Sequence, residues 1–287
     1  MTAHPLVTGS PPAWASEWGE DEFGVFVGFA VAEVVQRMRW IPPGRFSMGS
    51  PASEAGREEH EAAHEVELTQ GFWLGDTPVT QELWEAVMGN NPSRFVSPCR
   101  PVESVRSEQA MAFCANVEQR VSGLALHLPT EAQWEYACRA ETTTATYAGD
   151  LEIQGVNNAP VLDAIAWYGG NSGVNFDLDE GEASEAWPEK QYPHAKAGTR
   201  AVATKQPNAW GLFDTLGQVF EWCADWYDKY PPGPAVDPTG PARGRSRVIR
   251  GGSWYGFARN VRAACRGARS PGDRDHRLGF RCARGPE

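Results

Sequence analysis

The feature that most constrains the fold is the combination of 12 tryptophans with 30 glycines in a chain of 287 residues. Glycines and prolines break regular elements into short pieces, and indole rings can fill the space between irregular segments. After about residue 140 only short apolar runs remain between turn residues, and no long helical periodicity is present. The sequence therefore predicts a loop-rich domain with short strands around tryptophans.

Three helices are predicted in the first half of the chain. Apolar residues at helical spacing run through 80–88 and 107–121, and Gly89 stops the first of these segments. A third helix is expected from Thr130, whose hydroxyl can cap the first turn while Gln133 reaches back in a capping box.

Strands are predicted where apolar and polar residues alternate. The run 64–68 alternates like a half-buried strand, and 72–74 begins another. Residues 40–46 read as strand, turn and strand. Residues 23–40 fit either a helix or a pair of strands, so that segment stays open.

The formal charge of −11 narrows the classes of partner. An acidic surface repels phosphate backbones, which argues against a nucleic-acid partner. Residues 23–35 are apolar but are interrupted by Gly24, Gly28 and Glu33, so no membrane span is expected. No basic and apolar leader opens the chain, and a cytoplasmic location is the expectation.

Arginine without lysine fills the segment 243–284, whereas residues 16–67 are acidic. Guanidinium groups form fixed forks that suit carboxylates and backbone carbonyls. Many of these arginines are therefore expected to act as internal struts.

Residues 60–64 spell H-E-x-x-H, the zinc-protease signature. That motif needs a helix, but the preceding residues form an acidic loop and His64 begins an alternating strand. A metalloprotease is therefore not expected. The six cysteines form no C-x-x-C pair, and no phosphate-binding glycine loop or G-x-S-x-G elbow is present.

Two carboxylates, Asp214 and Glu221, bracket a glycine-containing turn. Two carboxylates with backbone carbonyls suit calcium, which prefers oxygen ligands. Alternatively, Glu221 pairs with an arginine in a tryptophan-rich core. Spacing alone does not separate the two interpretations.

The chain resembles the formylglycine-generating enzyme (sulfatase-modifying factor) family from about residue 40 to 284. The matching segments, in the family's order, are 46–50 (FSMGS), 77–80 (TPVT), 128–139 (LPTEAQWEYACR), 210–212 (WGL), 250–254 (RGGSW) and 278–281 (LGFR). The resemblance implies an α+β fold of the C-type-lectin-like class with little regular secondary structure. Residues 1–39 are then an N-terminal extension and 40–287 the domain.

The resemblance also implies metal sites and cysteine roles. It places a structural calcium on Asp214, Glu221 and the carbonyls of Gly217 and Val219, with Asn171 as a weak candidate for a second site. The family's two copper-binding cysteines fall at Gly256 and Val261, which carry no thiolate, so copper is not expected. Cys114 and Cys282 sit where family members often carry a disulfide, which a reducing compartment would leave as two thiols. Cys265 is expected either to pack in the interior or to pair with Cys138.

One branch of this fold, the variable proteins of diversity-generating retroelements, ends in a similar segment. In these proteins, reverse transcription mutates template adenines, typically in AAC asparagine codons. Replacing only those adenines never yields Lys, Glu, Gln, Met or Trp, and residues 255–281 contain none of these five. Arginine-rich relatives could also avoid them by chance. The residues expected to form a variable ligand-binding surface are Tyr255, Gly256, Phe257, Cys265, Gly267, Ala268, Ser270, Asp273, Asp275, His276 and Arg277.

The leading hypothesis is a non-catalytic module that binds a protein or small ligand through this surface. The alternative is a copper-dependent oxidase that acts on protein cysteine and uses Cys265 or a site that the alignment misplaces. A sulfoxide-synthase-like iron enzyme is disfavoured by the short N-terminal segment, and a purely structural role remains a further alternative.

Overall fold

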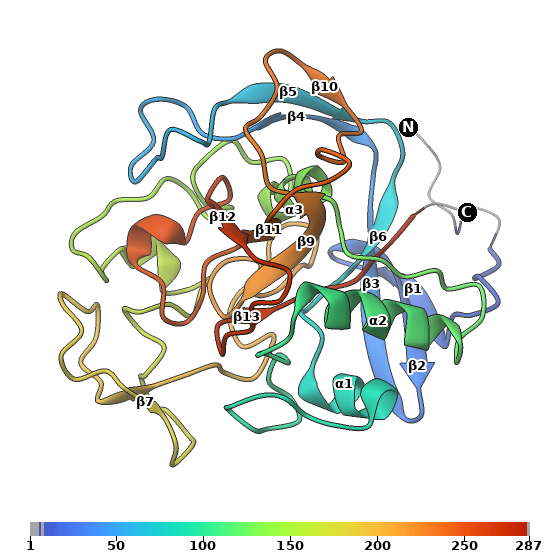
Figure 1. Cartoon of the computed structure of the whole chain (residues 1–287), viewed down its shortest axis with the longest axis horizontal. Helices are drawn as coiled ribbons and strands as arrows, with labels where there is room; N and C mark the ends of the chain where they lie inside the picture. The colour runs from blue at the N-terminus through green and yellow to red at the C-terminus, as the bar shows by residue number, and fades with distance from the viewer. Residues whose placement is uncertain (1–5, 7–8, 286–287) are drawn as a thin grey trace.

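The computed structural model describes residues 6 and 9–285, in which long loops connect short elements (Figure 1). The helices are α1 (Gln81–Met88), α2 (Ser107–Glu118) and α3 (Glu131–Arg139), with 3-10 turns η1 (Pro160–Leu162) and η2 (Ala258–Asn260). The strands are β1 (Glu17–Asp21), β2 (Gly24–Val31), β3 (Val34–Ile41), β4 (Gly44–Met48), β5 (His64–Leu68), β6 (Phe72–Gly75), β7 (Glu182–Ala183), β8 (Lys196–Ala197), β9 (Phe220–Trp226), β10 (Ala235–Val236), β11 (Arg247–Arg250), β12 (Arg266–Arg269), β13 (Leu278–Gly279) and β14 (Ala283–Arg284). The loop-rich architecture predicted from the glycines is confirmed.

The three predicted helices are present with the predicted caps. The Thr80 hydroxyl accepts from the backbone N–H of Leu83, and Gly89 ends α1 in the left-handed conformation. At α3, Thr130 and Gln133 form both bonds of the capping box. None of the helices in the described residues is long and apolar enough to cross a membrane.

A five-stranded sheet joins the two ends of the chain in the order β1-β2-β3-β6-β14. Residues 23–40, whose sequence fits either a helix or a pair of strands, form two antiparallel strands, β2 and β3. Helices α1 and α2 lie against this sheet (Figure 1). Phe29, Trp73 and Trp84 in the layer between them are completely buried.

The five-stranded sheet extends across the domain boundary that was expected from the sequence. The boundary between residues 39 and 40 falls inside β3, and β2 and β3 pair along their whole length. Residues 17–39 therefore belong to the same sheet as β6 and β14, and no separate N-terminal extension begins or ends at residue 39. The sequence of residues 23–40 was ambiguous because a buried strand pair and an apolar helix have similar hydrophobic patterns.

A second, four-stranded sheet has the order β12-β11-β9-β13, and a three-stranded sheet has the order β10-β5-β4. Helix α3 packs between them, with Trp134 directed into one core and Tyr136 into another. Five tryptophans are almost completely inaccessible, which confirms that indole rings fill the interior: Trp73, Trp84, Trp134, Trp222 and Trp254.

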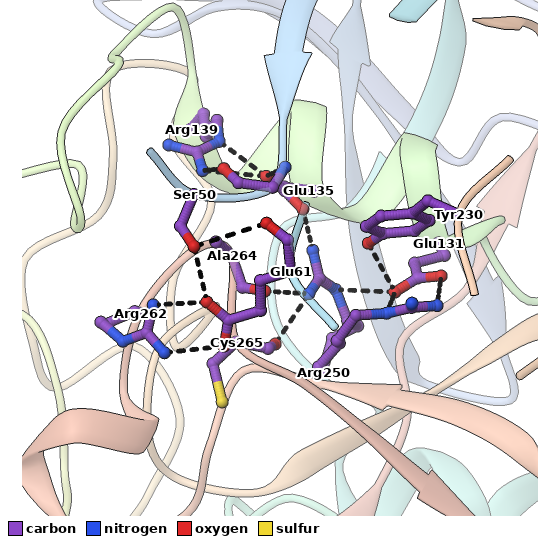
Figure 2. Close-up of polar contacts among 12 residues, drawn as sticks. Ser50, Glu61, Glu131, Glu135, Arg139, Tyr230, Arg250, Arg262, Ala264 and Cys265 are labelled. Carbon is purple, nitrogen blue, oxygen red and sulfur yellow. Dashed lines mark hydrogen bonds and ion pairs between the residues drawn. The ribbon is translucent and has the colours of Figure 1, made fainter. Parts of the chain in front are cut away.

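A buried ion-pair network connects the acidic loop, α3 and the arginine-rich segment (Figure 2). Arg262 donates to both oxygens of Glu61 at 2.7 and 2.8 Å, and Arg250 contacts Glu135. All four side chains are fully buried. The network also contains Ser50, Glu54, Glu131, Arg139, Tyr230 and Arg266. The prediction that arginines act as internal struts is confirmed.

The H-E-x-x-H segment lies in this network and not on a helix. Glu61 is the partner of Arg262, and His64 opens β5, where its Nδ1 lies 3.0 Å from the carbonyl oxygen of Ala62. The two histidines therefore do not share a helical face, as the sequence context predicted.

Candidate binding surface

The candidate surface begins where β11 ends in a tight turn. Gly251 and Gly252 both have positive φ, and a side chain at Gly251 would approach the carbonyl oxygen of Thr215 to 2.8 Å. The turn directs Trp254 inward, where its Nε1 donates to the carbonyl oxygen of His276 at 3.0 Å. The next residue, Tyr255, is consequently exposed.

Aromatic rings gather around Tyr255. Its ring centroid lies 4.6 Å from that of Trp187 and 5.6 Å from that of Trp254, both edge-on. The guanidinium of Arg277 lies 5.2 Å from the centre of the Tyr255 ring. We call Trp187, Tyr255, Asp275, His276 and Arg277 the Tyr255 patch.

Hydrogen bonds and burial set the ionisation of the titratable residues in the patch. Arg277 donates to Asp275 through Nε at 2.7 Å and also through Nη2. Burial alone would raise the pKa of Asp275, but the bonds and charge of Arg277 outweigh burial and hold it below the ordinary value. Burial lowers the pKa of His276, so its imidazole is neutral at pH 7. The patch thus offers aromatic faces, a neutral imidazole and one oriented guanidinium.

The sequence-predicted surface residues separate into three groups. Exposed ones are Tyr255, Phe257, Ala268, Ser270 and Asp273; half-buried ones are Cys265, Gly267, Asp275, His276 and Arg277; Gly256 is buried. Tyr255, Asp275, His276 and Arg277 come together. Phe257 instead borders a separate hollow of about 430 Å³ beside Val156 and Arg259.

Two glycines of the predicted set have little room for a side chain. A Cβ at Gly267 would lie 2.9 Å from Cγ1 of Ile249, and one at Gly256 would lie 3.0 Å from the carbonyl oxygen of Ser253. A side chain at either position would therefore require its neighbours to shift.

No sequence pattern pointed to three residues in or next to the patch, which are Trp187, Arg94 and Glu182. Trp187 reaches Tyr255 from a loop more than 60 residues earlier, and Arg94 pairs with Glu182 at 2.7 Å. Both charged residues act on the pKa of His276. Arg94 and Trp187 lie in irregular segments and Glu182 in the two-residue strand β7, so neither periodicity nor spacing could predict these contacts.

Comparisons with known proteins define the family. The sulfatase-modifying factor enzyme 1-like domain matches residues 28–286. The chain belongs to this family. The formylglycine-generating enzyme of Streptomyces coelicolor is 35% identical over 205 residues, covering 70% of this chain and 57% of that protein. The serine/threonine-protein kinase pkn1 of Chlamydia pneumoniae is 33% identical over 274 residues, covering 88% and 38%.

Solved structures support the same conclusion. Treponema denticola variable protein 1 has a TM-score of 0.73 and 31% identity, covering 91% of this chain and 99% of that chain. PvdO from Pseudomonas aeruginosa, at 21% identity and a TM-score of 0.70, shares the fold. The predicted C-type-lectin-like fold and family are confirmed, although the chain spans only part of the curated enzymes and kinases it matches.

Positions 256 and 261, where the resemblance places two copper-binding cysteines, are adjacent in space. A Cβ built at Gly256 would lie 3.6 Å from Cγ2 of Val261. Side chains at 256 and 261 therefore face each other, as a two-thiol copper site requires, but here the pair is a glycine and a valine. Cys265 is half-buried and follows Arg262, whose guanidinium is committed to Glu61.

The six cysteines are all free thiols. Cys114 and Cys282 are buried with their Sγ atoms 3.8 Å apart, so the first predicted pair is adjacent but not bonded. Cys138 and Cys265 are not bonded either, and burial raises the pKa of Cys138 to about 12.

Of the predicted calcium residues, Asp214, Gly217 and Val219 lie in the turn before β9, and Glu221 is the second residue of β9. Asp214 and Gly217 both have positive φ, and Val219 is buried directly after them. Glu221 accepts from Arg281 on both oxygens and from Nε1 of Trp134 at 2.7 Å, which is the arginine-pairing alternative. Asn171 points elsewhere, to Asp163.

Asp214 is the member of this set that fits a cation. It is 1% exposed, and its Oδ1 has no hydrogen-bond partner among the described residues, while Oδ2 accepts from Ala203. Burial raises its pKa to about 6. Among the described residues, no group of three or more His, Cys, Asp or Glu side chains is placed to hold a metal ion. A cation at this turn would need backbone oxygens as well.

Proposed function

We propose that the protein is a non-catalytic binding module whose recognition site is the Tyr255 patch. One observation carries the proposal: side chains at 256 and 261 face each other where the family places its thiols, and neither residue can ligate copper. A copper-dependent oxidase would need that soft-ligand pair.

The chemistry of the patch suits binding. Tyrosine and tryptophan supply large contact area with few rotatable bonds, and arginine adds directed hydrogen bonds. The patch rests on the buried Trp254 and on the β11 turn, so its exposed residues can vary without changing the core. Similarity to a protein named for its variability supports this proposal.

Site-specific photo-crosslinking tests the proposal. A benzophenone amino acid would replace Tyr255 or, as a control, Val236, which is 61% exposed on β10. Cells that make the protein would be irradiated, and adducts would be identified by mass spectrometry. We expect an adduct at 255 that Arg277→Ala weakens and that is absent at 236. Equal labelling at both positions, or none at 255, would contradict a recognition role.

We also propose that a calcium ion is held by Asp214 with oxygens of the turn that contains Gly217 and Val219. The unpartnered buried Oδ1 of Asp214 supports this assignment. Glu221 would contribute through the lone pair of Oε1 left free by Arg281, which donates once to that oxygen. The ion would neutralise the Asp214 charge and fasten the turn that leads into β9.

A further inference from the structure

A cavity of about 380 Å³ lies on another part of the molecule, between the start of α3 and the proline-rich loop after β9. Its volume is within the range of pockets that hold small organic ligands. Pro231, Pro238, Pro241 and Tyr230 form apolar walls, and Asp225 and Glu131 form an acidic floor. None of these residues belongs to the Tyr255 patch.

The two floor carboxylates have different surroundings. Arg266 donates two hydrogen bonds of 2.7 Å to the Glu131 carboxylate. The Tyr230 hydroxyl donates a third to Glu131 at 3.1 Å (Figure 2). Asp225 is 4% exposed and accepts the backbone N–H of Glu131 at 2.8 Å. No cation of the described residues forms an ion pair with Asp225.

A buried carboxylate without a cationic partner is costly, because the interior replaces its hydration poorly. Gly240, whose φ is +68°, lets the loop approach the carboxylate closely. A Cβ at this position would lie 3.2 Å from Oδ1 of Asp225. The loop therefore closes over the acid without supplying a charge to it.

We propose that this cavity binds a small organic ammonium ion, with the charged nitrogen on Asp225 and a short apolar body against the prolines and Tyr230. An anionic ligand is disfavoured because the fork of Arg266 is already occupied by Glu131. Of the other basic side chains in the lining, Lys229 is exposed and His64 is half-buried.

Binding should depend on the ionisation of Asp225. Burial raises its pKa to about 7, so a proton and the ammonium ion compete for the carboxylate near neutrality. The titratable and charged groups around it are Glu131 of α3, His64 of β5, Arg247 of β11, Arg266 of β12, and Asp228, Lys229 and Tyr230 of the loop.

Calorimetric titration with 3-phenylpropylamine tests the proposal, with 3-phenylpropionate as the matched anion. We expect the amine to bind the full chain at pH 8 and to bind more than about tenfold more weakly at pH 5.5, where Asp225 is mostly protonated. Asp225→Asn should cause a similar loss at pH 8, since asparagine keeps the acceptor for Glu131 but not the charge. Near-UV circular dichroism would establish that the variant is folded.

Tyr255→Ala serves as a control that should leave amine binding unchanged. It separates this site from the Tyr255 patch, so either proposal can fail alone. The proposal is overturned if the native chain does not bind the amine at millimolar concentration. Undiminished binding by Asp225→Asn, or equal binding of the propionate, would overturn it as well.

Discussion

At the scale of single residues, the buried arginines decide which side chains can be changed. Each arginine in the network neutralises glutamates that the fold has removed from water, and loss of one partner leaves an uncompensated buried charge. The arginine-rich composition was enough to predict this role. It could not predict the partners, because Glu61 and Arg262 are 201 residues apart.

Arg262→Met should lower the free energy of unfolding by roughly 3–5 kcal/mol, since Glu61 and Glu54 would lose their cation inside the protein. Urea denaturation measures the change. Arg274→Met, at an exposed position, is the matched control and should stay within about 0.5 kcal/mol. Equal effects of the two substitutions would mean that the buried network adds nothing beyond surface charge.

The free energy of unfolding should depend on pH through the ionisation of Asp214. Its folded pKa of about 6 exceeds the ordinary value of 3.8, so the folded state holds the proton more tightly and loses this stabilisation as pH rises from 4 through 6. With calcium chelated, Asp214→Asn should therefore gain about 2 kcal/mol relative to the native chain between pH 4 and pH 7.5. Parallel stability curves for the two proteins would contradict the assignment.

Calcium should reverse that penalty, because an ion on Asp214 replaces the missing partner. Millimolar calcium is expected to raise the Tm of the native chain at pH 7.5 and to leave Asp214→Asn nearly unchanged. Scanning calorimetry with and without chelator makes the comparison. An equal shift in both proteins would place any bound calcium elsewhere.

At the scale of elements, the N-terminal strands are part of the domain core. The helices were predictable because their caps and apolar stripes are local, as Thr130 and Gln133 illustrate. Strands β2 and β3 were only one of two alternatives, because β6, which pairs with β3, lies in another part of the chain. The expected boundary at residue 39 was misplaced for the same reason.

Phe29→Ala in β2 should destabilise the whole domain by about 3–5 kcal/mol, since the ring is fully buried between the sheet and the helices. Val35→Ala in β3, at a side chain that is 48% exposed, should cost far less. Chemical denaturation monitored by tryptophan fluorescence would detect a single transition. A separate early transition in Phe29→Ala would indicate that the N-terminal strands unfold independently.

At the scale of the whole molecule, the proposed binding site lies on the family scaffold. The Tyr255 patch is next to positions 256 and 261, where the resemblance places two cysteines and this chain has a glycine and a valine. Of the eleven surface residues predicted from the sequence, five are exposed. Trp187, Arg94 and Glu182 became visible only when the loops were placed together.

The most direct test is to incubate the protein with copper(I), a reductant and a cysteine-containing sulfatase-type peptide, and to weigh the peptide by mass spectrometry. Gly256→Cys/Val261→Cys, which restores a facing thiol pair, is the matched comparison and should bind copper(I) more tightly than the native chain. The native chain is expected to leave the peptide unchanged. Conversion of the peptide cysteine to an aldehyde by the native chain would contradict a non-catalytic role.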